Sequence, residues 1–140
     1  MNKNFEIYKD KGSVLAIVVR NNFRTKGNYF FTEKNSPQQL AYVSHRKGKI
    51  IQPHIHNKFK RVITYTQEID ILKKGEIKLY LYTNAGRFFK SLTLKGGDLI
   101  FFASGGHAYK VIKKIDLILI KQGPYAGEKD KTYLTGCELK

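Results

Sequence analysis

Apolar residues recur with a period of two over short stretches of this chain, and this pattern constrains the fold most. Such alternation places successive side chains on opposite faces of a β-strand. Turn signals rich in glycine or asparagine separate the stretches at residues 47–48, 74–75, 84–86, 96–98 and 104–106. The predicted strands are residues 14–20, 39–45, 49–56, 60–66, 69–74, 76–83, 87–94, 97–103, 107–113 and 115–122. Short strands with this spacing are typical of an all-β sandwich or barrel.

The length and composition indicate a single domain over residues 1–140. Domains commonly have about 100–200 residues, and an apolar fraction of 41% is enough to build a core. We expect the barrel core at about 39–122, N-terminal strands within 5–35 and a polar C-terminal tail at 126–140. The lone Cys137 excludes an intramolecular disulfide and a zinc site made of thiolates.

The formal net charge is +15, from 26 basic and 11 acidic residues. Nucleic acid is nevertheless an unexpected partner, because the basic residues are scattered and no nucleic-acid-binding motif is found. We expect instead a small anionic molecule that is steered to its site by basic residues. The chain has no secretory signal and no apolar stretch of membrane-spanning length, so we expect a cytoplasmic protein without a membrane partner.

Two histidines stand two positions apart in the predicted strand 49–56. Strand alternation places Gln52, His54 and His56 on one face. Imidazoles at such positions are about 7 Å apart along the backbone, and both can bind one ion at about 2.0–2.2 Å from a ring nitrogen. The pair alone indicates either a metal site or histidines that are exposed or stacked.

The spacing around this pair resembles the two motifs of the cupin superfamily. The motifs read Gly48-x5-His54-x-His56-x11-Glu68-x6-Gly75 and Gly97-x5-Ala103-x-Gly105-x-His107. The resemblance covers roughly Lys47 to Lys121 and implies a double-stranded β-helix, the cupin or jelly-roll barrel. The eleven residues between His56 and Glu68 are more than is common in the family and imply an extra loop or a longer strand pair there.

Carried onto this sequence, the ligand positions of the family are His54, His56, Glu68 and His107. Three imidazoles and a carboxylate suit one divalent ion of iron, manganese, nickel or zinc, with up to two positions open. The chain is most similar to small single-domain bacterial cupins, some of which occur among surface-polysaccharide and nucleotide-sugar genes. This resemblance implies a homodimer and a small, anionic, sugar-like or nucleotide-sugar ligand.

Three functions are consistent with this resemblance, and the sequence does not decide whether the chain is an enzyme. The first is a metal-dependent enzyme of carbohydrate or polysaccharide biosynthesis. The second is a non-catalytic sugar-binding or sensor cupin. The third is a metal-independent isomerase or epimerase of nucleotide-linked sugars.

Other polar residues are candidates for proton transfer or ligand binding. Glu68 and Asp70, two positions apart on one face, are the candidates for moving a proton. Asp70 is either a partner that orients an imidazole or a strand-end residue open to solvent. Gln52, Lys58 and Arg61 are candidates for binding the ligand, with a solvated surface as the alternative for each.

Overall fold

The computed structural model describes residues 4–137 and 139, and it divides into two compact units. The sheet unit comprises residues 1–23 and 65–140, and the hairpin unit comprises residues 24–64. Strands and loops make up nearly all of the described chain, with one short 3-10 helix, η1 (Gly127–Asp130). The predicted all-β fold class is therefore confirmed. None of the helices in the described part of the chain is long and apolar enough to cross a membrane.

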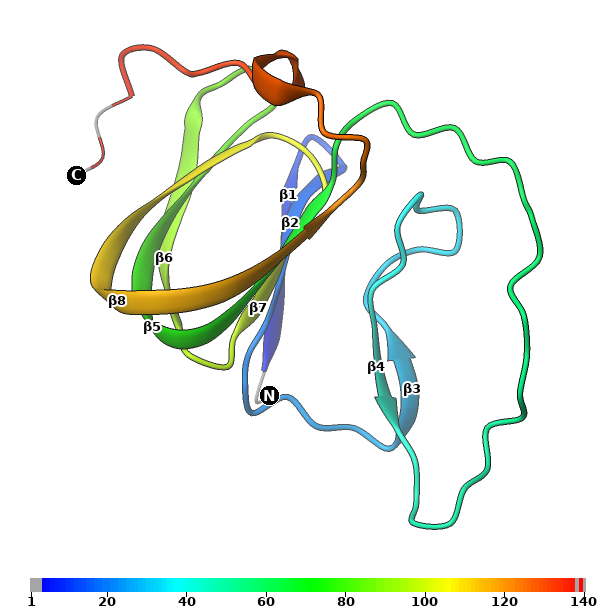
Figure 1. Cartoon of the computed structure of the whole chain (residues 1–140). Helices are drawn as coiled ribbons and strands as arrows, with labels where there is room; N and C mark the ends of the chain where they lie inside the picture. Colours follow the sequence, from blue (N-terminus) through cyan, green and yellow to red (C-terminus); the bar gives the residue numbers. More distant parts are fainter. Residues whose placement is uncertain (1–3, 138, 140) are drawn as a thin grey trace. The chain divides into compact units, whose positions relative to one another are not determined.

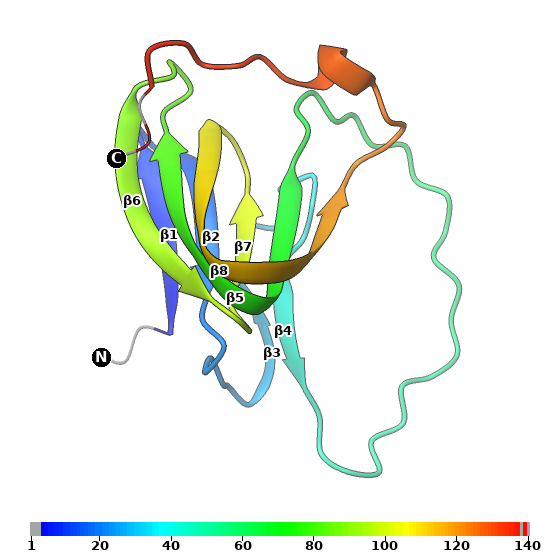
Figure 2. The same ribbon diagram turned by 60° about the vertical axis from the view of Figure 1, so that its left-hand side comes forward.

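The sheet unit contains one curled antiparallel sheet (Figures 1 and 2). Its strands are β1 (Phe5–Asp10), β2 (Ser13–Val19), β5 (Glu68–Tyr82), β6 (Phe88–Lys95), β7 (Leu99–Phe102) and β8 (Gly106–Lys121). They follow the order β1-β2-β7-β5-β6, and β8 pairs with β5. The predicted strands at 14–20, 87–94 and 97–103 correspond to β2, β6 and β7.

The strands β5 and β8 are long and bend together at their middle. Each was expected as two strands, 69–74 and 76–83 for β5 and 107–113 and 115–122 for β8, and that expectation is wrong. Gly75 has φ +92°, and a Cβ at this position would lie 2.1 Å from the carbonyl oxygen of Lys114 on β8. The pairing register shifts between Leu72 and Ile77. A glycine and local bulges thus let the strand bend without ending.

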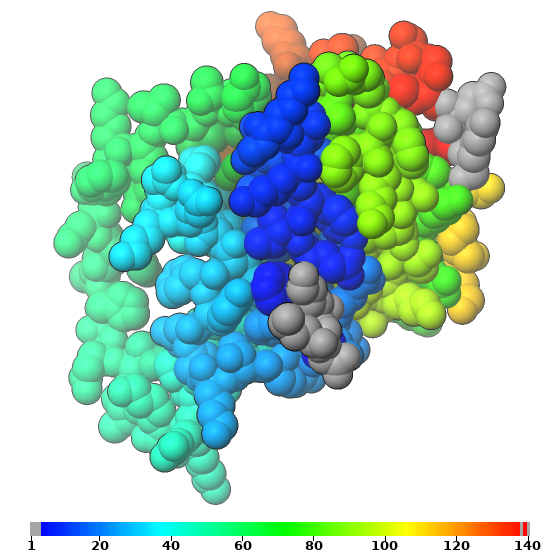
Figure 3. Space-filling view, turned by 180° about the vertical axis from the view of Figure 1, so that it is seen from behind, coloured from blue at the N-terminus to red at the C-terminus, as the bar shows by residue number. Residues whose placement is uncertain are grey.

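The bend brings the outer strands β1 and β6 together, as Figure 3 shows for the dark blue and the light green surfaces. The ammonium group of Lys90 on β6 lies 5.4 Å from the ring centroid of Tyr8 on β1. Arg20, directly after β2, donates a hydrogen bond of 2.8 Å to the carbonyl oxygen of Thr93 on β6. These contacts curl the sheet into a half-barrel whose concave face holds the core.

The core side chains project from β2, β5, β6 and β7. They are Ala16, Val18, Leu72, Ile77, Leu79, Leu81, Leu94, Ile100 and Phe102. All are aliphatic or aromatic, and burial of such side chains is the main favourable term in folding. This cluster defines the concave face, so a polar side chain that projects with it is an exception that needs explanation.

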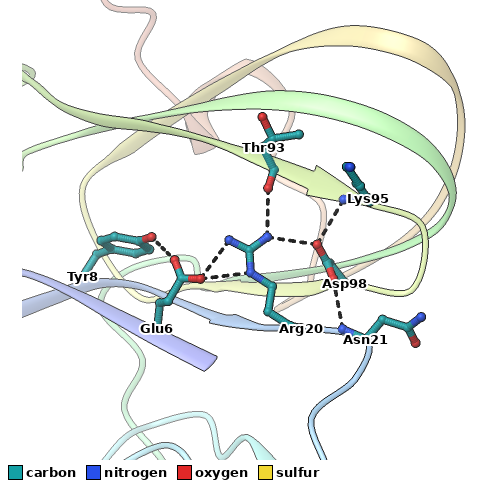
Figure 4. Close-up of polar contacts among 7 residues, drawn as sticks. All are labelled: Glu6, Tyr8, Arg20, Asn21, Thr93, Lys95 and Asp98. Atoms are coloured by element: carbon teal, nitrogen blue, oxygen red, sulfur yellow. Dashed lines mark hydrogen bonds and ion pairs between the residues drawn. The ribbon is translucent and has the colours of Figure 1, made fainter. Parts of the chain in front are cut away.

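A polar network around Arg20 ties β1 and β2 to the β6–β7 turn (Figure 4). The Arg20 guanidinium donates to Glu6 at 2.8 and 3.0 Å and to Asp98 at 3.0 Å. The Asp98 carboxylate also accepts hydrogen bonds of 3.0 Å from the backbone N–H groups of Asn21 and Lys95. Both carboxylates therefore have charged or backbone donors, so the network is structural.

The hairpin unit contains the antiparallel pair β3 (Gly27–Phe30) and β4 (Ala41–Ser44). Between Ser44 and Glu68 the described chain forms no strand, so the predicted strands at 49–56 and 60–66 are wrong. A β-strand needs the backbone of a partner strand, and these residues have none in the hairpin unit. Large apolar side chains in this stretch stay exposed, such as Ile55 (90%) and Val62 (79%).

Candidate functional site on the concave face

Glu68 and His107 meet on the concave face although they stand at opposite ends of one strand pair. In the β5–β8 pairing, Glu68 lies opposite Lys121, whereas His107 lies opposite Leu81. The bend in the two strands brings their ends together, so that Glu68 Oε1 lies 3.5 Å from His107 Nε2. Two residues that are distant along the chain are thus brought together by the curl of the sheet.

The imidazole of His107 is stacked on an aromatic ring. Phe102 of β7 lies opposite Glu68 in the β5–β7 pairing, so both side chains share the concave face. The ring centroids of Phe102 and His107 are 3.7 Å apart, with an angle of 14° between the planes. Stacking on one side and the Glu68 carboxylate at Nε2 together restrict the orientation of the His107 ring.

Asp70 is the buried carboxyl group of this site. It follows Glu68 by two positions on β5, lies opposite the core residue Ile100 and is only 4% exposed. Its Oδ1 atom is buried without a hydrogen-bond partner among the described residues. The expectation of a strand-end Asp70 open to solvent is therefore wrong, because β5 is paired with both β7 and β8 at this residue, and Asp70 lies opposite the core residue Ile100.

The two carboxyl groups have pKa values that move in opposite directions. Burial, with the charge of Glu68 adding to it, raises the pKa of Asp70 from 3.8 to about 6. The hydrogen bond from His107 lowers the pKa of Glu68, although burial opposes this, and the charge of Lys121 adds to the lowering. Below about pH 6 such a separated pair can hold one proton donor beside one ionised acceptor.

Tyr109 extends the polar cluster along β8. It follows His107 by two positions, so it projects from the same face, and it packs partly buried against the core. Burial, and then the negative charges of Asp70 and Glu68, raise the pKa of its phenol group. The phenol thus stays protonated at neutral pH and can donate a hydrogen bond.

Sequence reasoning missed Phe102 and Tyr109 as members of the site. The signal for Tyr109 was available, since strand alternation places positions 107 and 109 on one face. The signal for Phe102 depends on the pairing of β7 with β5, which only the structure supplies. We name Glu68, Asp70, Phe102, His107 and Tyr109 the concave-face cluster.

His54 and His56 lie in the hairpin unit, within the stretch that forms no strand. Both are exposed, their ring centroids are 5.2 Å apart, and His54 Nδ1 lies 2.8 Å from the carbonyl oxygen of Gln52. The expected strand alternation does not place these side chains, because the strand is not formed. The ligand set of His54, His56, Glu68 and His107 stays a prediction.

The three predicted ligand-binding residues also lie in the hairpin unit. Gln52, Lys58 and Arg61 are exposed. The Arg61 guanidinium lies 5.1 Å from the ring centroid of Phe59 and donates to the Phe59 carbonyl oxygen at 3.3 Å. The role of these side chains in ligand binding stays a prediction.

The fit of a metal ion can be tested on the concave-face cluster itself. Glu68 and His107 supply a carboxylate and an imidazole, which are common ligands of divalent transition metals. Across residues 4–137 and 139, however, no three His, Cys, Asp or Glu side chains are grouped so that they could hold an ion. The cluster therefore offers two donors and needs further ligands to complete a metal centre.

Comparison with known proteins identifies no relative of this chain. No family model matches it, and neither a curated protein nor a solved structure does. The assignment of a function therefore depends on the chemistry of the concave-face cluster.

Proposed function

We propose that the concave-face cluster binds a small, anionic, sugar-like molecule and that a divalent metal ion is its cofactor. The observation that carries this proposal is the convergence of Glu68 and His107 beside the buried Asp70. The buried Asp70 carboxyl group, with the partly exposed Glu68 carboxylate beside it, destabilises the fold, because charges and unpaired acceptors lose their hydration. Clusters of this kind are more frequent at functional sites than elsewhere.

The cupin architecture, a double-stranded β-helix, is the finer fold that we propose for this chain. It is supported by the curled antiparallel sheet and by the position of His107 at the start of the last long strand. Glu68 and His107 are then the two metal ligands of the sheet unit, and His54 and His56 are the expected further ligands. A bound ion would supply Lewis acidity toward a hydroxyl or carbonyl group of the ligand.

Charge supports an anionic ligand. The chain carries a net charge of +15, from 26 basic and 11 acidic residues. A positive field raises the local concentration of phosphate or carboxylate groups near the site. Hydroxyl groups of a sugar would be donors to the partly exposed Glu68 carboxylate.

Acid–base chemistry without a metal is the second candidate, and one observation favours it. Only two of the four predicted ligands meet in the sheet unit, and these two form a histidine–carboxylate pair. With Asp70 as proton donor and Glu68 as ionised partner of His107, the cluster can transfer protons between carbon and oxygen atoms of a sugar. This is the chemistry of the isomerase or epimerase alternative.

The proposal is tested by binding and turnover measurements on four proteins. Mn(II) and a panel of nucleoside-diphosphate sugars and sugar phosphates are titrated into the wild type, His107→Ala, the double variant His54→Ala with His56→Ala, and His45→Ala. His45 is the matched control, because it is exposed and lies outside the predicted ligand set.

We expect His107→Ala to lose binding and His45→Ala to keep it. Loss of Mn(II) binding in the double variant assigns His54 and His56 as ligands. Sugar binding that survives removal of the metal and depends on His107 supports the acid–base candidate. Wild-type affinity for every compound in His107→Ala would overturn both candidates. Turnover, followed by NMR spectroscopy of the sugars, separates an enzyme from a non-catalytic binding protein.

A further inference from the structure

The C-terminal segment, residues 126–137, is anchored beside Glu68. Asp130 accepts a hydrogen bond of 2.6 Å from Thr66 Oγ1 and one of 3.2 Å from Lys121 Nζ. Thr66 precedes Glu68 by two positions, and Lys121 lies opposite Glu68 in the β5–β8 pairing. One carboxylate therefore joins the two chain segments that flank Glu68.

The same segment is anchored a second time beside His107. A Cβ atom on Gly106 would lie 3.1 Å from Leu134 Cδ1, and one on Gly86 would lie 3.1 Å from Leu134 Cδ2, so Leu134 packs against both glycines. Gly106 directly precedes His107. Figures 1 and 2 show the segment, in orange and red, crossing from the end of β8 toward the turn between β5 and β6.

We infer that the C-terminal segment positions Glu68 against His107 and that Asp130 is the positioning residue. Only four positions separate Asp130 from Leu134, so this short stretch joins the two ends of the β5–β8 pair. The role given to the Glu68–His107 pair rests on the proposed function, whereas the contacts that hold the segment do not. Asp130 acts through its hydrogen bonds with Thr66 and Lys121, which flank Glu68.

The physical reason is that strand ends open more readily than strand centres. Glu68 is the first residue of β5 and His107 is the second residue of β8, so both stand where a strand frays. Hydrogen bonds to a charged carboxylate are stronger than those between neutral groups. The hydrogen bonds from Thr66 and Lys121 also lower the pKa of Asp130, which keeps the carboxylate ionised near neutral pH.

The test uses a signal that overall stability does not move. Because His107 is stacked on Phe102, the ring current of Phe102 shifts the His107 ring protons upfield in an NMR spectrum. We compare wild type with Asp130→Asn, which removes the charge, and with Thr66→Val, which removes only a hydroxyl donor. Asp130→Glu serves as the conservative variant. The control is Asp116→Asn, an exposed aspartate elsewhere on β8.

We expect both Asp130→Asn and Thr66→Val to reduce or lose the upfield shift and to weaken Mn(II) binding about threefold, as for contacts near a surface. Asp130→Glu and Asp116→Asn should keep the shift. A wild-type shift in folded Asp130→Asn or Thr66→Val, with only a lower unfolding midpoint, would overturn the inference. If the wild type binds no Mn(II), the metal proposal fails, while the NMR signal still decides the role of Asp130.

Discussion

The sheet unit and the hairpin unit both contain stretches with the period-two pattern of β-strands, but only one of them uses the pattern fully. In the sheet unit such stretches pair with neighbours, and Leu79 is completely buried. In the hairpin unit the residues after β4 form no strand, and Ile55 is 90% exposed. The comparison teaches that alternation indicates the tendency to form a strand, while a strand partner decides whether it forms.

The same difference divides the predicted metal ligands. Glu68 and His107 project from paired strands and meet at 3.5 Å. His54 and His56 lie on backbone without strand partners. The positions of side chains on paired strands are fixed more precisely than those of side chains on loops. We therefore assign the main part of the proposed site to the sheet unit.

The largest effect should come from a cavity in the core of the sheet unit. Leu79→Ala should lower the free energy of unfolding by about 2–5 kcal/mol, because it removes buried methyl groups and leaves a cavity. The matched change in the hairpin unit, Ile55→Ala, should alter it by less than about 0.5 kcal/mol. Urea unfolding of both variants measures this. An equal loss in the two variants would contradict the contrast between the units.

A glycine in each unit provides the second comparison. Gly75→Ala should destabilise the protein by about 1–3 kcal/mol from backbone strain at positive φ, and overlap with the Lys114 carbonyl should add to this. Gly48 in the hairpin unit also has positive φ, but no atom lies within 4 Å of an added Cβ. The loss of stability in Gly48→Ala should therefore come from backbone strain alone and be smaller than in Gly75→Ala. Equal unfolding midpoints for these variants would contradict the role of Gly75 in the bend.

Asp70 should make the stability of the metal-free protein depend on pH. Its folded-state pKa is raised from 3.8 to about 6, so between these values the folded protein holds a proton that the unfolded chain has released. Stability should therefore fall as pH rises from about 4 to about 6 and stay lower above that. Asp70→Asn should remove this slope and be more stable than wild type at pH 8 by about 1 kcal/mol.

Urea unfolding in the presence of a chelator, across this pH range, measures the slope. Asp116→Asn is the control, because Asp116 is exposed on the same strand pair and should leave the slope unchanged. If the stability of Asp70→Asn depended on pH as strongly as that of the wild type, a group other than Asp70 would be the cause, and the prediction would be wrong.

The smallest effect should come from a surface charge of the hairpin unit. If Arg61 helps to bind the anionic ligand, Arg61→Ala should weaken binding about threefold at low salt and reduce the dependence of affinity on salt. Calorimetric titrations at low and high ionic strength measure both quantities, with the exposed Lys47→Ala as control. Unchanged affinity at low salt would remove Arg61 from the predicted ligand site.

The fold class could be predicted from sequence because alternation and turn residues are local signals. The predicted strand at 87–94 is β6 within one residue at each end. The continuous strand β5 could not be predicted, because Gly75 reads as a turn until the close approach of Lys114 is seen. The strand at 49–56 was overpredicted, since local pattern cannot show that a partner strand is missing.

The site was also predictable in part, where its residues are related by local strand alternation or motif spacing. Glu68 and Asp70 share a face by alternation alone, and His107 was found by its motif spacing. The stacking of Phe102 on His107 depends on strand pairing, and the anchoring of Asp130 depends on a contact across 64 residues of chain. No local pattern encodes such contacts.

Element-specific anomalous X-ray diffraction from crystals grown with Mn(II) tests the central claim most directly. The account predicts one anomalous peak at binding distance from both the Glu68 carboxylate and the His107 imidazole. A map without a peak at these two side chains, in crystals that hold Mn(II) elsewhere or not at all, would contradict the proposed metal site.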